Sequence, residues 1–182
     1  MSDLSLRLRN TGYAFILAHE LGHVRFQHPG YNGVPVTVAQ GNETQADRFG
    51  LELMRRTGTI PMGAMLFFQS GIFYFENRAD FPSDAAWQTY LTQKATHPLT
   101  AARLRALSNQ VRTMADDFAR GQPNRSATIV SIRFIGDQFA RLATFLDDLV
   151  LQRVMRAKAE RSAPTTLLPR RERETAKDFP IR

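Results

Sequence analysis

The chain has 182 residues, 43% of them hydrophobic and 23% charged, values typical of one soluble globular domain with its own core. It contains no cysteine, which excludes disulfides and thiolate metal ligands, so a metal ion would have to be bound by His, Asp or Glu. Residues 156–182 hold eight Lys/Arg and four Asp/Glu, and this tail supplies +4 of the net charge of +7.

The first predicted helix covers residues 6–28 and ends at Pro29 and Gly30. Apolar residues at helical spacing form a stripe along it. These are Tyr13, Ile16, Leu17, Leu21 and Val24. Residues 31–41 are predicted to be a loop. Within it, the weak alternation of residues 34–38 predicts a short extended segment, which Pro35 limits to a sheet edge.

Asn42 is expected to cap a second helix over residues 43–56, and Gly58 to stop it. Further helices are predicted over residues 61–75, 85–95 and 99–120. The apolar run at residues 64–75 is too short to cross about 30 Å of hydrocarbon, so we expect a buried core helix. A membrane-dipping or partner-binding helix is the alternative.

A long helix is predicted over residues 127–159. Its apolar seam alternates steps of three and four residues, as in a coiled coil. The seam consists of Ile132, Ile135, Phe139, Leu142, Leu146 and Leu149. Packing on the chain's own domain and a homodimer through residues 128–158 are both open. Residues 162–182 are polar, charged and proline-containing, which predicts a disordered basic tail.

Residues 19–23 of the first helix read HELGH. Residues four apart lie on one face of a helix, so His19 and His23 can bind one ion. Glu20, one position further round, can reach the open side of that ion and take a proton from its water. The alternative is an ordinary helix with two surface histidines. His28 lies about 140° round the helix from His23 and is expected to face away, as a surface or helix-end residue.

A catalytic zinc ion needs a third protein ligand. A metzincin would have glycine at position 26 and histidine at position 29, but this chain has Phe26 and Pro29, which excludes that class. Glu43 opens the second helix, and Asp47 follows one turn later on the same face. We therefore expect Glu43 to bind the metal. Asp47 could then accept the hydrogen bond that orients a histidine ligand.

HExxH followed by ExxxD resembles the gluzincins, the thermolysin-like zinc peptidases. Residues 43–50 read ETQADRFG and residues 96–104 read THPLTAARL. Both resemble motifs of the CAAX-protease/HtpX family and its soluble mini-gluzincin relatives. The phage-exclusion Lit-type peptidases are similar at the first two motifs and are the second candidate family.

The resemblance implies a Zn²⁺ cofactor and a catalytic Glu20. It also implies that His97 lines the site, where its imidazole could hydrogen-bond the oxyanion of the reaction. By its own sequence context, His97 fits a helix-capping or structural histidine better, and the resemblance reverses that preference. Arg103 is expected to pair with Asp47 or Glu43.

The chain departs from the CAAX-protease/HtpX pattern ahead of the zinc helix. Members of that family usually carry strands there, which pair with the extended substrate, and often transmembrane helices. Fewer than about twenty residues precede His19, which leaves too little chain for a sheet by the usual strand length. We therefore expect that the substrate edge is supplied differently or that the chain is part of a longer one.

The sequence thus predicts a mainly α-helical, single zincin-like domain with little or no sheet. Residues 1–121 would form the metallopeptidase domain, residues 122–161 the long helix and residues 162–182 the tail. The predicted function is a zinc-dependent endopeptidase acting on a peptide or protein. The alternative is a non-proteolytic, metal-stabilised interaction module. We expect a cytoplasmic location, no nucleic-acid partner and no transmembrane segment; peripheral membrane contact stays open.

Overall fold

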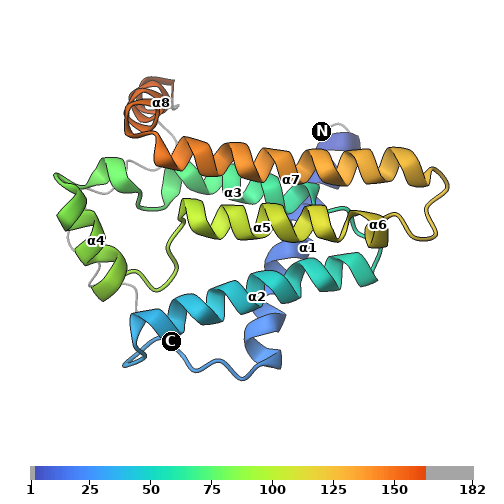
Figure 1. The fold of residues 1–182 in the computed structure, drawn as a ribbon, viewed down its shortest axis with the longest axis horizontal. Helices are drawn as coiled ribbons and strands as arrows, with labels where there is room; N and C mark the ends of the chain where they lie inside the picture. Colours follow the sequence, from blue (N-terminus) through green and yellow to red (C-terminus); the bar gives the residue numbers. More distant parts are fainter. Residues whose placement is uncertain (1–2, 163–182) are drawn as a thin grey trace.

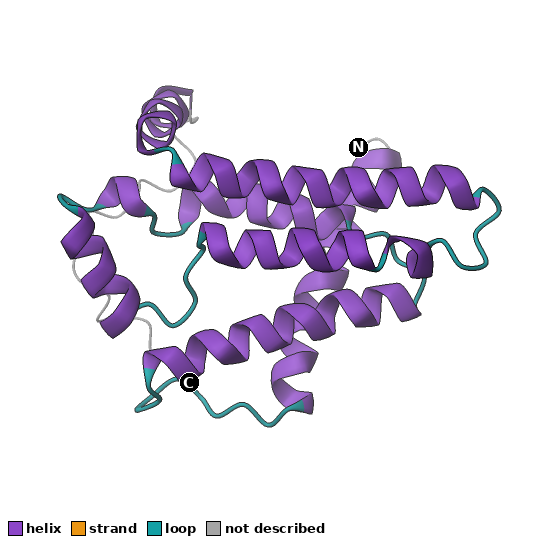
Figure 2. Ribbon diagram, viewed as in Figure 1, coloured by secondary structure: helices purple, strands orange, loops and turns teal. Residues whose placement is uncertain are grey.

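A computed structural model describes residues 3–162 of the chain (Figure 1). This part consists of helices joined by loops and contains no strand (Figure 2), which confirms the prediction of a mainly α-helical single domain. The tail predicted beyond Ser162 lies outside the described residues. The helices are α1 (Asp3–Arg25), α2 (Val36–Arg56), α3 (Met62–Tyr74), the 3-10 helix η1 (Arg78–Asp80), α4 (Asp84–Gln93), α5 (Ala101–Thr113), α6 (Ala115–Phe118), α7 (Arg125–Asp147) and α8 (Leu149–Ser162).

The core lies between α3, α5 and α7, with α1 crossing behind them and α2 below α5 (Figure 1). Phe15, Phe68 and Phe139 come from three different helices, and each is at most 1% exposed. Their rings make edge-to-face contacts, Phe15 with Phe68 and Phe68 with Phe139. Phe68 belongs to the long apolar run of the sequence, which is therefore a core helix, as predicted.

The apolar seam of α7 is buried within the chain. Ile132, Ile135, Phe139 and Leu146 belong to the common core, and α7 packs along α5. The packing alternative thus accounts for this seam, while a homodimer stays a prediction.

The long helix predicted over residues 127–159 is wrong, because the chain breaks at Asp148, where ψ is 96°. The Asp148 side chain accepts a hydrogen bond from the backbone N–H of Leu151 (2.9 Å) and so caps α8. Gln152 is 1% exposed and donates to the carbonyl of Leu146 across the break. The helix predicted over residues 99–120 is likewise two, α5 and α6, separated at Met114.

The extended segment predicted at residues 34–38 is also wrong. Helix α2 begins at Val36, directly after Pro35, seven residues before the predicted start at Glu43. Proline is favoured at helix starts because its φ is already helical. The extra turns bury Ala39 completely and bring Gln40 against α4. This packing outweighs the cost of Gly41 inside the helix, which is about 1 kcal/mol.

Glycine allows α1 to approach both of its neighbours closely. A Cβ atom at Gly63 of α3 would lie 2.0 Å from the backbone nitrogen of Gly12 in α1. A Cβ atom at Gly22 of α1 would lie 3.0 Å from the Cα of Ala46 in α2, and one at Gly50 would lie 3.3 Å from the backbone nitrogen of His19. The histidines of α1 are therefore held directly against α2.

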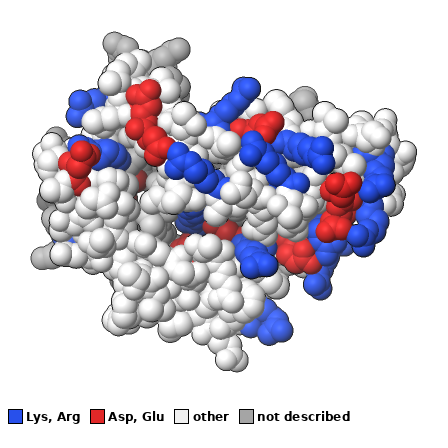
Figure 3. All heavy atoms as spheres, in the orientation of Figure 1, with Lys and Arg blue, Asp and Glu red and all other residues white. Residues whose placement is uncertain are grey.

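The apolar stripe predicted on α1 does not face the core. Tyr13, Leu17, Leu21 and Val24 are each more than half exposed, whereas Phe15 and the histidine face point inward. None of the helices described is both long and apolar enough to cross a membrane. Figure 3 shows that Lys, Arg, Asp and Glu gather over α5 and α7, while the surface over the start of α2 carries few of them. Residues 26–42, which include this start, contain no such residue at all.

Candidate metal centre

Helix α1 places His19 and His23 one turn apart with their imidazoles converging. The two Nε2 atoms lie 3.1 Å apart. Phe15, one turn earlier, packs its ring against His19, which is only 9% exposed. The helical spacing of the HELGH motif therefore brings both ring nitrogens to one point, as the sequence predicts.

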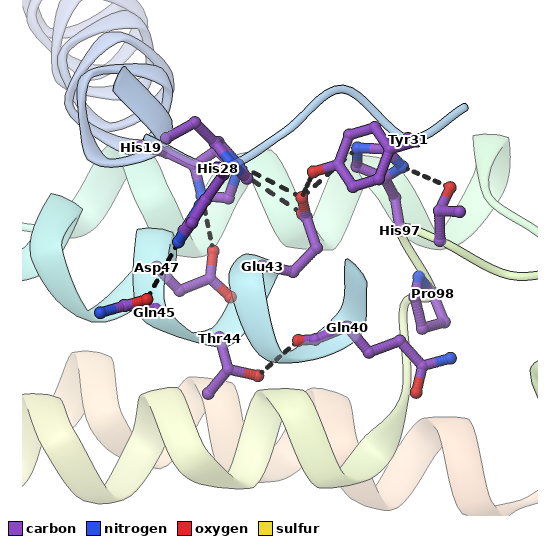
Figure 4. Close-up of polar contacts among 12 residues, drawn as sticks. His19, His28, Tyr31, Gln40, Glu43, Thr44, Gln45, Asp47, His97 and Pro98 are labelled. Carbon is purple, nitrogen blue, oxygen red and sulfur yellow. Dashed lines mark hydrogen bonds and ion pairs between the residues drawn. The ribbon is translucent and has the colours of Figure 1, made fainter. Parts of the chain in front are cut away.

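Glu43 of α2 completes this group (Figure 4). Its Oε2 lies 3.5 Å from Nε2 of His19 and its Oε1 lies 3.2 Å from Nε2 of His23. Glu43 is 2% exposed. Burial alone would raise its pKa. Hydrogen bonds with His19 and Tyr31, together with the nearby charge of Arg103, lower it instead to about 2.

The spacing of these three groups suits a bound metal ion. Ligands bound at about 2.1 Å to a tetrahedral ion lie about 3.4 Å from one another. The two Nε2 atoms lie 3.1 Å apart, and each has one oxygen of Glu43 within 3.5 Å, which is close to that spacing. His19, His23 and Glu43 together form the group in the described part of the chain that could hold a metal ion.

Asp47, one turn after Glu43, holds the other side of His19. Its Oδ1 lies 3.0 Å from Nδ1 of His19, which leaves Nε2 directed at the metal position. Arg103 of α5 donates to both oxygens of Asp47, at 2.6 and 2.9 Å, and to Glu43 at 3.2 Å. Arg103 thus pairs with both acids.

These acids set the charge state of His19. Burial lowers its pKa, but the hydrogen bonds to Asp47 and Glu43 and their charges outweigh this and raise it to about 9. A metal ion must therefore displace a proton from His19 at neutral pH.

His28 does not face away from the site. Its Nδ1 lies 2.9 Å from Nδ1 of His23, and its Nε2 lies 2.9 Å from Oε1 of Gln45 (Figure 4). The expectation from the helical wheel fails because α1 ends at Arg25. Gln27 then takes a positive φ of 53°, which turns the chain back toward the histidines.

Tyr31 and His97 lie beside Glu43. The hydroxyl of Tyr31 donates to Oε1 of Glu43 at 2.5 Å, and Nε2 of His97 lies 3.3 Å from the same oxygen. The two rings are in edge contact, with centroids 4.1 Å apart. Sequence reasoning missed Tyr31, because a single tyrosine in a predicted loop carries no motif.

A cavity of about 200 Å³ opens next to these groups. Glu20, which is exposed on α1, lines it together with His19, Glu43 and His97. Asp47 and Arg103 also line it, and aromatic and aliphatic side chains form the remaining wall: Phe15, Ile16, Phe67, Phe68, Phe75 and Leu99. The structure thus brings all seven predicted site residues to one place, and all of them except His23 line this cavity.

The sequence matches the Peptidase U49 family over residues 8–122, which is more than half of the chain. The chain belongs to the Peptidase U49 family. This family is the Lit-type one, the second of the two resemblances in the sequence, and the match does not extend to the CAAX-protease/HtpX family. No curated protein and no solved structure shows significant similarity to the chain. The U49 segment contains every residue of the metal centre, whereas α7 and α8 lie beyond it.

Proposed function

We propose that the chain is a zinc-dependent endopeptidase with His19, His23 and Glu43 as metal ligands. The observation that carries this proposal is the convergence of the ligand atoms: two Nε2 atoms 3.1 Å apart, each with an oxygen of Glu43 within 3.5 Å. His19 and Glu43 line the same cavity as Glu20. Membership of a peptidase family supports a peptide or protein as substrate.

Zinc at this site would lower the pKa of a water molecule and polarise the scissile carbonyl. Glu20 follows His19 in the chain, is exposed and carries a carboxylate on the cavity wall. It would take the proton of the attacking water and deliver it to the leaving amine.

His97 would bind the oxyanion that develops at the scissile carbonyl. Its side chain is 46% exposed and lines the cavity, and Oγ1 of Thr96 lies 2.8 Å from its Nδ1. This contact leaves Nε2 directed toward Glu43. The third sequence motif, which resembles the CAAX-protease/HtpX family, supports the same position for His97.

The test compares two variants with the wild type. Glu20→Gln should keep about one zinc per chain. It should hydrolyse a library peptide that the wild type cleaves at least about 100-fold more slowly, because the proton acceptor is gone. His19→Ala should lose the zinc as well. Glu52→Gln, a substitution on α2 outside the cavity, is the control and should cleave like the wild type. Wild-type cleavage by Glu20→Gln would disprove the assigned mechanism.

A metal-stabilised interaction module is the second candidate. Residues 3–162 contain no strand that could pair with an extended substrate, and the apolar stripe of α1 is exposed. This alternative predicts zinc binding without cleavage in a broad peptide library. Cleavage that Glu20→Gln abolishes would exclude it.

A further inference from the structure

If His23 binds zinc, its second ring nitrogen needs a hydrogen-bond acceptor, and none of the three sequence motifs supplies one. A histidine that binds zinc through Nε2 must carry its proton on Nδ1, and this N–H needs an acceptor that fixes the ring. Asp47 provides the acceptor for His19. For His23, the group within hydrogen-bond distance of Nδ1 is Nδ1 of His28, at 2.9 Å.

His28 can accept this hydrogen bond only in one of its two neutral tautomers. Its Nδ1 must be bare, so its proton must sit on Nε2. Oε1 of Gln45 lies 2.9 Å from that Nε2 and accepts its hydrogen bond. With Gln45 as the acceptor, His28 donates to Gln45 and His23 donates to His28. Nε2 of His23 then carries no proton and lies beside Glu43.

We propose that His28 and Gln45 are positioning residues for the metal, with Gln45 acting through His28 to keep Nε2 of His23 free of a proton. Helix α2 would then supply Glu43 as a ligand and, two and four residues later, the acceptors that orient both histidines. Asp47 acts on His19 directly and Gln45 acts on His23 through His28. This inference rests on the proposed zinc site.

The local structure holds His28 for this role. After the turn at Gln27, the ring of His28 stacks on Phe26, with centroids 5.7 Å apart. Phe26 in turn packs edge-on against Phe49 of α2. The segment after α1 is therefore tied to α2, and Gln45 lies on the same helix.

The experiment measures zinc dissociation constants by chelator competition. His28→Ala should weaken zinc binding about 10- to 100-fold, since loss of such an acceptor typically costs this much. His28→Asn should restore most of the affinity, because its side-chain oxygen falls near the place of Nδ1. The metal-free unfolding midpoint of both variants should match the wild type. The d–d absorption of bound Co²⁺ should change in His28→Ala.

Gln45 offers a matched pair of variants. Gln45→Glu keeps an acceptor and should bind zinc at least as tightly as the wild type. Gln45→Lys replaces the acceptor with a donor and should bind about two- to ten-fold more weakly. In a His28→Ala background the lysine should have no further effect, because the connection to His23 is already lost.

Any of three results would overturn the inference. His28→Ala could bind zinc as tightly as the wild type, or His28→Asn could bind zinc as weakly as His28→Ala. Gln45→Lys could also weaken zinc binding as much in the His28→Ala background as in the wild type. If the wild type itself binds no zinc, the proposed function fails together with this inference. If the wild type binds zinc and Glu20→Gln is inactive, an unchanged zinc affinity in His28→Ala would disprove this inference and leave the proposed function standing.

Discussion

At the scale of single residues, the buried charges of the site balance without a metal. Glu43 and Asp47 are 2% and 3% exposed, and two cations face them. Arg103 pairs with both acids, and His19 is protonated at neutral pH because its pKa is about 9. A bound metal ion would replace the proton of His19. Both buried carboxylates thus have cationic partners within the chain itself.

Gln40 connects the metal-ligand helix to the loop that carries His97. Its side-chain N–H groups donate to the carbonyls of Leu91 and Ala95, at 2.8 and 2.9 Å. Gln40→Ala should therefore loosen the loop, lower kcat several-fold and destabilise the fold by about 1–3 kcal/mol. Zinc content should not change, because Gln40 contacts no ligand. Gln88→Ala, at an exposed position of α4, is the control. A loss of zinc from Gln40→Ala that matches its loss of kcat would contradict this role of Gln40.

At the scale of helices, the sequence predicts what depends on local periodicity and fails where contacts between distant segments decide. The spacing of His19 and His23 is fixed by one helix, so their convergence is predictable. The start of α2 depends on Gln40 reaching α4, a contact that no local pattern shows. The position of His28 depends on the positive φ of Gln27, which is an unusual conformation for a glutamine.

The break between α7 and α8 had a local signal that the apolar seam obscured. Asp148 is a good N-cap, and its side chain accepts a hydrogen bond from the backbone N–H of Leu151, three residues later. The seam continues through Leu149 with unbroken helical spacing, which favoured one long helix. Periodicity thus describes the buried face but not the continuity of the backbone.

The crossing of α1 and α3 should tolerate no side chain at Gly63. A Cβ atom there would lie 2.0 and 2.2 Å from backbone atoms of α1, and backbone cannot move aside like a side chain. Gly63→Ala should lower the free energy of unfolding by about 3 kcal/mol or more. Gly41→Ala in α2, where no atom lies within 4 Å of the new Cβ, should raise it by about 0.5–1 kcal/mol. Urea denaturation measures both, and equal effects would refute the close crossing.

At the scale of the whole molecule, five parts of the chain build one cavity, four of them with polar groups and α3 with aromatic ones. Helix α1 supplies Glu20, α2 supplies Glu43, α5 supplies Arg103, and the loop before α5 supplies His97. The apolar wall comes mainly from α1 and α3. The close crossing of these two helices therefore sets the size of the space in which a substrate side chain would lie beside the reacting groups.

The apolar wall predicts a preference for an apolar substrate side chain next to the scissile bond. A volume of about 200 Å³ admits one large aliphatic or aromatic side chain, and burying it is worth about 1.5–3 kcal/mol. Phe75→Ala enlarges the cavity and should shift the ratio of kcat/KM for tryptophan over leucine peptides by about ten-fold toward tryptophan. Phe134→Ala removes an exposed ring on α7, away from the cavity, and should leave that ratio unchanged. Identical ratios in all three proteins would show that the cavity does not receive the substrate side chain.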